Sequence, residues 1–125
     1  MIELEDSLTH LTLAPAVGGS LVNWTVRATG QPLLRHSDEA ALNTGLPGKL
    51  ACYPLAPWSN RVAHGGFDNP GGWLALTPNS PLDPLPIHGS AWQQAWQVVS
   101  QTADEVVLEL SLIHISAPTR LRRIS

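Results

Sequence analysis

The sequence predicts an all-β protein with the architecture of an antiparallel β-sandwich. Short segments of alternating apolar and polar residues recur along the chain, separated by residues that favour turns. Pro and Gly are abundant, with eleven and ten copies among 125 residues. No window carries the i, i+3, i+4, i+7 apolar stripe of an amphipathic helix. A chain of this length forms one domain at most, with a modest core.

The first predicted element is a hairpin. Residues 8–13 (LTHLTL) alternate between apolar and polar side chains, and Pro15 and a Gly18-Gly19 turn end the run. Residues 21–27 then return as the antiparallel partner.

The middle of the chain predicts two further strands and a loop. Residues 31–35 form a short third strand after a turn, and the polar, turn-rich residues 36–48 form a loop. Residues 49–53 are apolar and predict a buried strand, which delivers a loop over residues 54–61.

Two more hairpins are expected toward the end. Residues 65–68 and 73–76 flank an Asn-Pro-Gly-Gly turn, a strong hairpin signal. Residues 77–86 contain four Pro and cannot continue a sheet. Residues 96–100 and 105–110 form the last hairpin, around Thr-Ala-Asp.

Two segments concentrate residue types that can hold a polar ligand. Residues 53–62 read YPLAPWSNRV, and residues 85–92 read LPIHGSAW. Together they carry one Arg, one His, one Asn and two Trp, punctuated by Pro and Gly. Planar donors bond to hydroxyl oxygens, and an indole face covers the apolar C–H side of a sugar ring. These residues therefore suit a polyhydroxylated ligand.

Both segments resemble motifs of the aldose 1-epimerase (mutarotase) family, in the bacterial form that carries a PLxPWSNRI-like stretch and then a PIHGxxWxxxW stretch. The two motifs occur in the family's order and at about its separation, and the resemblance covers roughly residues 18–108. It implies that residues 1–109 are a partial domain, the N-terminal portion of a galactose mutarotase-like β-supersandwich.

The resemblance also implies an activity. Family members interconvert the α and β anomers of free aldoses such as galactose and glucose, without a cofactor. A carboxylate general base takes the anomeric hydroxyl proton while an imidazole general acid protonates the ring oxygen. The resemblance gives substrate-binding roles to Asn60, Arg61 and His88. The general-acid His and general-base Glu of the family match no motif after Leu108. We therefore expect a fragment without a catalytic pair, inactive as given.

Each of these residues also has a structural interpretation. Arg61 could pair with Asp68 or bond to loop carbonyls, and Asn60 could simply cap its turn. A single His such as His88 is often an ordinary loop residue. The resemblance favours the sugar-binding role for all three. Trp58, Trp92 and Trp96 are candidate stacking surfaces. Trp96 continues into a strand and favours the core, whereas the two interpretations of Trp92 are balanced.

Other chemistries have little support in the sequence. The His residues are scattered, and no His-x-His or Cys-x-x-Cys spacing predicts a metal site. A Cys52–His88 nucleophilic pair fits on residue types alone, but the apolar segment around Cys52 favours an inert core thiol. No GxGxxG or GxxxxGK[ST] motif predicts nucleotide binding.

Charge and hydropathy set further expectations. The net charge is −3, and three of the seven basic residues lie in the last six positions. The chain without residues 110–125 has four basic and ten acidic residues, so it offers no footprint for nucleic acid. An acidic start, no membrane-length apolar run and a single cysteine predict a soluble cytoplasmic protein. The oligomeric state is left open.

The end of the chain has a separate origin in our interpretation. Residues 110–120 (LSLIHISAPTR) closely resemble LSLIHISEPTR, a translated transposase adapter used in preparing sequencing libraries, with Ala117 as the one departure. We therefore expect residues 110–125 to be a non-native tail. The alternative is a real strand, because residues 106–115 alternate well.

Three functions are compatible with the sequence, in decreasing order of support. The first is a truncated aldose 1-epimerase that is inactive alone. The second is a non-catalytic carbohydrate-binding β domain that uses Arg61, His88 and Trp92. The third is a small β protein of unrelated function with a basic interaction arm.

Overall fold

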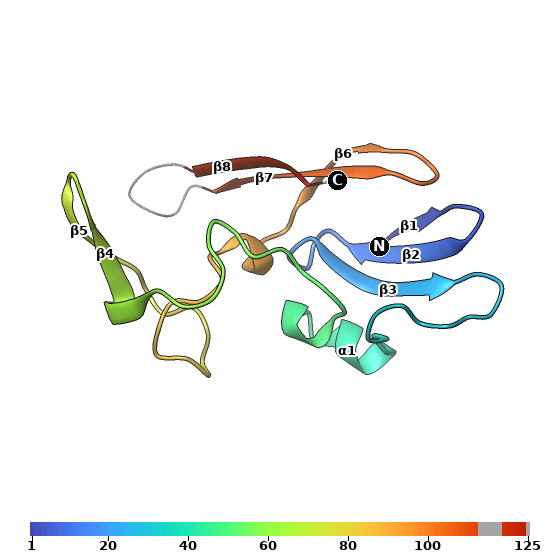
Figure 1. The fold of residues 1–125 in the computed structure, drawn as a ribbon, viewed down its shortest axis with the longest axis horizontal. Helices are drawn as coiled ribbons and strands as arrows, with labels where there is room; N and C mark the ends of the chain where they lie inside the picture. Colours follow the sequence, from blue (N-terminus) through green and yellow to red (C-terminus); the bar gives the residue numbers. More distant parts are fainter. Residues whose placement is uncertain (113–118, 125) are drawn as a thin grey trace.

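The computed structural model describes residues 1–112 and 119–124, and the regular elements there are almost all antiparallel strands (Figure 1). The predicted all-β, antiparallel sandwich class is confirmed. The strands are β1 (Ile2–Glu5), β2 (Thr9–Ala14), β3 (Ser20–Val26), β4 (Gly66–Asn69), β5 (Gly72–Ala75), β6 (Gln97–Gln101), β7 (Val106–Leu112) and β8 (Thr119–Ile124). In the described part they form sheets in the orders β1-β2-β3, β4-β5 and β6-β7-β8.

The first sheet contains the predicted hairpin and one strand that we did not predict. β2 and β3 pair from Thr9↔Val26 to Ala14↔Ser20, with a register shift after Thr12. β1 adds to the other edge of β2, although its four residues are too few to show a period. The predicted hairpins at β4–β5 and β6–β7 are also present.

The main core lies where the first sheet meets β7. Along β7, residues 106–110 alternate between buried and half-buried, whereas every residue of β6 is exposed. The buried members of this cluster are Leu4, Leu13, Ala91, Trp96, Val106, Leu108 and Leu110. The N–H of Glu5 donates to the carbonyl of Ala103 across 2.8 Å, which joins the end of β1 to the β6–β7 turn. Burial on one face only is the pattern expected of a sheet in a sandwich.

Three predictions about the middle segment were wrong. Residues 31–35 contain only an isolated bridge from Thr25 to Pro32, flanked by the bonds Val26 N–H to Gln31 O and Leu33 N–H to Trp24 O. The ladder goes no further, because the Asn23 side chain instead bonds to the N–H and carbonyl of Ser37. The expected loop over residues 36–48 contains α1 (Glu39–Asn43), whose first turn is capped by the Asp38 carboxylate accepting from the N–H of Ala41 at 2.8 Å. Residues 49–53 make a single bridge, Leu21↔Cys52, and a 3-10 turn (Pro47–Lys49) precedes it.

The segment between α1 and β6 is mostly loop and carries the candidate site. Its β4–β5 hairpin projects to the left in Figure 1, away from the first sheet. Two 3-10 turns, Ala63–Gly65 and Ala91–Gln93, flank the irregular stretch that includes residues 77–90. As predicted, these Pro-rich residues form no strand. Within the described residues, no helix is long and apolar enough to cross a membrane.

Candidate functional site

The two motif-bearing loops lie side by side although 28 positions separate Asn60 from His88. Arg61 bridges Ile87 in the antiparallel sense, and Ala56 bridges Gly89 in the parallel sense. The N–H of Val62 donates to the carbonyl of Pro86 at 3.1 Å, and the N–H of His88 donates to the carbonyl of Asn60 at 2.9 Å. The fold therefore brings together Asn60, Arg61 and His88.

Gly89 permits this close approach. A Cβ at position 89 would lie 2.0 Å from the carbonyl oxygen of Ala56, and its φ of +62° is in the left-handed region. Any other residue would collide with backbone atoms and strain its own backbone. The glycine in the PIHG motif thus lets the second loop pack directly on the first.

Asn60 and His88 share an unusual backbone geometry and a direct hydrogen bond. Their φ values are +60° and +61°, a conformation in which Asn and His are enriched among non-glycine residues. The N–H of Asn60 donates to Nδ1 of His88 at 3.0 Å. Nδ1 must therefore be unprotonated, so a neutral His88 carries its proton on Nε2. The ring can then offer an N–H donor to a ligand, as expected of a sugar-binding His.

Arg61 is held by a carboxylate that we did not predict. Its Nε donates to Oδ2 of Asp83, and its backbone N–H and Nη1 approach Oδ1 of Asn60 at 2.9 and 3.4 Å. The structural alternative named Asp68 as the partner, so that expectation was wrong. The Arg61 side chain is 52% exposed while that of Asp83 is 9% exposed. The guanidinium is thus fixed at one edge and still faces solvent.

Hydrogen bonds keep Asp83 ionised. The backbone N–H of Leu85 donates to the carboxylate at 3.0 Å and is the main cause that lowers the pKa of Asp83 below that of an ordinary Asp. Desolvation acts in the opposite direction, whereas Arg61 lowers this pKa further through its hydrogen bond and its charge. Asp83 therefore supplies a negative charge beside Arg61 and His88.

The tryptophans occupy three different environments. Trp96 is 5% exposed and its Nε1 donates to the carbonyl of Ala91, which confirms the core assignment. Trp92 is half-buried, meets His88 edge-on at 6.3 Å between ring centroids, and donates through Nε1 to the carbonyl of Gly89 at 2.8 Å. Trp58 is half-buried, and its Nε1 finds no hydrogen-bond partner among the described residues. Trp92 is thus a support for the second loop.

Asn79 is another residue that the sequence did not single out. Its side-chain amide donates to the carbonyls of Ile87 and Gly89, each at 2.8 Å, and its oxygen accepts from the N–H of Ile87, also at 2.8 Å. The sequence around it, Pro78-Asn79-Ser80, shows only a turn. A hydrogen bond to a loop eight residues away leaves no signal in the local pattern.

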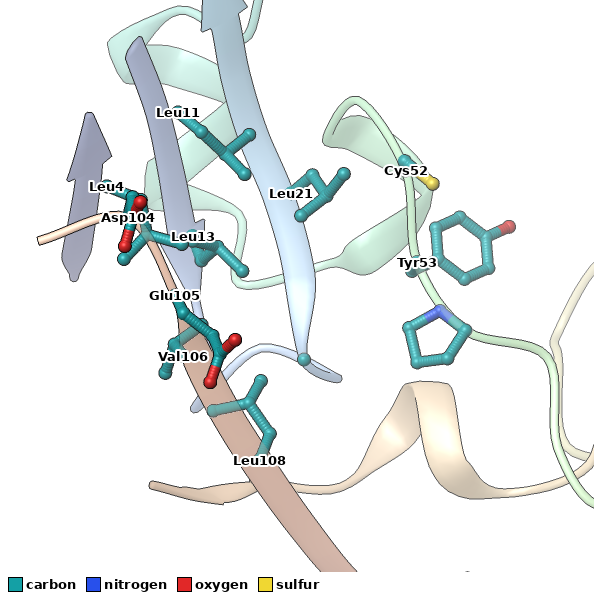
Figure 2. Close-up of a pocket in the computed structure, with 12 residues that line it drawn as sticks. Leu4, Leu11, Leu13, Leu21, Cys52, Tyr53, Asp104, Glu105, Val106 and Leu108 are labelled. Atoms are coloured by element: carbon teal, nitrogen blue, oxygen red, sulfur yellow. The ribbon is translucent and has the colours of Figure 1, made fainter. Parts of the chain in front are cut away.

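An apolar cavity lies apart from Asn60, Arg61 and His88. It measures about 660 Å³ and lies between the first sheet and β7, with Leu4, Leu11, Leu13 and Leu21 facing Val106 and Leu108 (Figure 2). A second cavity of about 520 Å³ is lined by Trp58, β5 residues and Asn79. Asn60, Arg61 and His88 line neither, so they form an open polar surface.

Cys52 does not join this surface as a nucleophile. It is exposed, which corrects the expectation of a core thiol, and it lines the large apolar cavity beside Tyr53 (Figure 2). No hydrogen bond between Cys52 and His88 is found in the part of the chain that the structure describes. The same part contains no group of three or more His, Cys, Asp or Glu that could hold a metal ion.

Fold and site together define a strand-rich protein in which two loops present planar polar side chains on an open surface. The family model for aldose 1-epimerase matches residues 1–117, and the chain belongs to that family.

Individual relatives agree with this membership. The protein YphB of Escherichia coli (strain K12) is 35% identical over 77 residues, which cover 62% of this chain and 25% of YphB. A crystal structure of a protein named as a putative aldose 1-epimerase from Escherichia coli K12 aligns with a TM-score of 0.80 and 29% identity, over 90% of this chain and 36% of that one. The Slr1438 protein of Synechocystis sp. PCC 6803 aligns with a TM-score of 0.66 and 28% identity, over 90% and 37%. The matched part of the chain thus spans 25% to 37% of the length of these relatives.

Proposed function

We propose that this chain supplies sugar-binding loops of an aldose 1-epimerase that interconverts the α and β anomers of free hexoses such as galactose or glucose by acid/base ring opening. Family membership supports a sugar substrate. The observation that carries the proposal is the hydrogen bond from Asn60 N–H to His88 Nδ1, beside the half-exposed Arg61 guanidinium. This arrangement brings together the three residues to which the resemblance gives a substrate-binding role, Asn60, Arg61 and His88.

Each of these residues has a role in this proposal. Nε2–H of His88 donates to a sugar oxygen, because Nδ1 is already bonded to backbone. Arg61 directs donors to neighbouring hydroxyls or to the ring oxygen, with Asp83 fixing its orientation. The side-chain amide of Asn60 donates to a hydroxyl while its oxygen receives the N–H of Arg61. No cofactor takes part.

Catalysis needs more than binding. Ring opening requires a general base at the anomeric hydroxyl and a general acid at the ring oxygen, both placed within hydrogen-bond reach. The family motifs that bear these groups have no counterpart in this sequence. We therefore propose that the 125-residue chain binds aldoses without accelerating mutarotation.

Tryptophan fluorescence tests the binding step, since Trp92 contacts His88 directly. We expect galactose or glucose to change the emission saturably, and His88→Ala to weaken binding about tenfold, as loss of one hydrogen bond to a sugar oxygen does. His64→Ala is the matched control, because His64 is an exposed His on a nearby turn with the same positive φ of 61°. No sugar response from the folded chain would contradict the proposal.

Polarimetry tests the absence of catalysis. The chain should leave the rate of galactose and glucose mutarotation unchanged, and acceleration that disappears in His88→Ala would show a complete active site. Sugar binding by a chain that is stable and never part of a longer product would instead favour the second candidate, a non-catalytic carbohydrate-binding domain. Its support is that all three residues hold one another through contacts within the chain.

Two further parts of the proposal concern origin and location. We propose that residues 110–125 are not native, and an independent read of the source DNA from an amplicon made without transposase adapters tests this. A reading frame that continues past codon 110 into other sequence supports the proposal, and confirmation of residues 110–125 overturns it. We also propose a cytoplasmic location, the expectation that the acidic start of the sequence and its lack of a membrane-length apolar run set.

A further inference from the structure

The side chain of Asn79 forms hydrogen bonds to the second loop on both sides of His88. Its Nδ2 donates to the carbonyls of the residues before and after the histidine, Ile87 and Gly89. Its Oδ1 accepts from the N–H of Ile87, so the contact with Ile87 is a two-way pair. All three donor–acceptor distances are 2.8 Å, and the side chain is partly buried. One amide therefore uses both Nδ2 protons and its oxygen on the peptide groups around a single residue.

These three hydrogen bonds lie on either side of a residue with a strained backbone conformation. His88 has a φ of +61° and is followed by Gly89 at +62°. A non-glycine residue in this region carries a strain on the order of 1–3 kcal/mol and keeps its conformation only when neighbouring contacts determine it. The carbonyls of Ile87 and Gly89 face Asn79 only while His88 keeps this conformation. The three hydrogen bonds of Asn79 therefore stabilise the positive-φ conformation of His88.

The backbone conformation of His88 in turn sets the direction of its imidazole ring. His88 donates its N–H to the carbonyl of Asn60 and receives the N–H of Asn60 on Nδ1, at 2.9 and 3.0 Å. Rotation of the peptide groups on either side of His88 would break this reciprocal pair. Trp92 Nε1 also donates to the carbonyls of Gly89 and Ile87, at 2.8 and 3.3 Å, but it cannot hold the Ile87 N–H.

We propose that Asn79 is a positioning residue. By fixing the positive-φ backbone conformation of His88, it holds the imidazole in the Nε2–H tautomer, with the donating nitrogen presented to the sugar. This role rests on the proposed function in assigning the sugar to His88. It adds a residue outside both motif segments and explains how a Pro-rich loop without regular secondary structure keeps a ligand-facing ring in one state.

The tautomer can be measured directly in the absence of any sugar. Nitrogen-15 NMR separates protonated from unprotonated imidazole nitrogens, and at about pH 8 a free His is neutral and exchanges between tautomers. In the unmodified chain, we expect His88 to show one protonated and one unprotonated nitrogen. In Asn79→Asp, which keeps the Oδ1 acceptor and the size but loses both donors, the two resonances should move toward a common average. Asn79→Ala should behave in the same way.

Asn69→Ala is the matched control. Asn69 is an exposed Asn in the β4–β5 turn whose Oδ1 accepts from the N–H of Gly71, so the same truncation there removes a turn contact away from His88. The His88 resonances should be unchanged in this variant. His88 resonances in Asn79→Asp and Asn79→Ala that match those of the unmodified chain would overturn the proposal.

Sugar titrations separate this proposal from the function on which it rests. If the unmodified chain binds galactose or glucose, Asn79→Asp should weaken binding about tenfold or more, while Asn69→Ala should not. A shifted tautomer in Asn79→Asp with no sugar binding by the unmodified chain would remove the proposed function and keep the positioning role. If both Asn79 variants unfold, the test uses the unmodified chain. Slow solvent exchange of the Asn79 side-chain amide protons would support the positioning role, and rapid exchange would overturn it.

Discussion

At the residue scale, the candidate site depends on one backbone contact as much as on its polar side chains. The carbonyl of Ala56 accepts from the N–H of Ala91 at 3.1 Å and lies where a Cβ of residue 89 would be. Only glycine can occupy that position without moving the loops apart. The polar groups of His88 and Asn60 meet because this approach is allowed.

Gly89→Ala should therefore destabilise the chain by more than about 2 kcal/mol, since left-handed strain on the order of 1–3 kcal/mol adds to a collision with backbone. Chemical denaturation measures the change. Gly45→Ala is a graded control, because Gly45 has a φ of +64° but an added Cβ would meet nothing within 4 Å, so it should cost only the strain. Gly48→Ala, with neither feature, should change stability by less than about 0.5 kcal/mol. Equal effects of all three substitutions would show that the close approach at residue 89 has no energetic weight.

The same scale shows why sequence predicted only part of the site. Asn60, Arg61 and His88 stand in two compact segments, and both segments resemble family motifs. Asp83 and Asn79 lie between those segments in a Pro-rich loop that carries no period and no motif. Their roles come from contacts 22 and 8 residues away, which only the folded chain reveals.

At the element scale, the two strands of the last hairpin contribute very differently. β7 buries Val106, Leu108 and Leu110 against the first sheet, whereas Val98 and Val99 of β6 are 43% and 52% exposed. The hairpin strand predicted over residues 105–110 is present as β7, and every second residue from Val106 to Leu110 is buried. β6 has apolar residues in sequence but no element of the described chain covers them.

Leu108→Ala should lower the free energy of unfolding toward the lower end of the usual 2–5 kcal/mol, about 2–3 kcal/mol. The reason is that Leu108 is 4% exposed, yet one side already borders the apolar cavity and makes fewer contacts there. Leu82→Ala is the matched control, because Leu82 is 94% exposed and should cost less than about 0.5 kcal/mol. Thermal or urea denaturation that ranks the two equally would show that β7 is not part of a packed core.

Elements were predicted where the local pattern was strong. The β2–β3, β4–β5 and β6–β7 hairpins each combine alternating residues with a Gly-containing or Asp-containing turn, and all three are present. β1 was missed because four residues show no period. α1 was missed because a five-residue helix depends on its Asp38 cap more than on an apolar stripe. Residues 31–35 pair with β3 only around Thr25 and Pro32, because beyond Leu33 the chain bonds to the Asn23 side chain and not to its backbone, a contact that local sequence does not show.

At the scale of the whole molecule, contacts distant in sequence join the first sheet to the last hairpin. Apart from side-chain packing, the bond from Glu5 N–H to Ala103 O and that from Trp96 N–H to Pro15 O link the two ends of the described chain. The cavity between these sheets shows that their packing is incomplete in this chain. We therefore expect the packing of the two sheets against each other to be less stable than the strand pairing within each hairpin.

Hydrogen exchange should report this docking at single amides. The Glu5 amide should be protected while the sheets are docked, and Leu108→Ala should accelerate its exchange by weakening the shared core. The Thr102 amide, which bonds to Glu105 within the β6–β7 turn, is the internal control and should exchange at the same rate in both chains. Equal acceleration at both amides would mean that the molecule opens only as a single unit.

The hydrogen bonds described for Asn60, Arg61 and His88 join residues within 53–92, whereas the bond from Glu5 N–H to Ala103 O joins two sheets across about a hundred positions. Short loops close with less loss of entropy and form sooner than distant pairings. On a ribosome, the segment bearing Asn60, Asn79 and His88 leaves the exit tunnel before β7 does. The ligand-facing loops can therefore take shape during synthesis, ahead of the sheet packing that encloses the rest of the molecule.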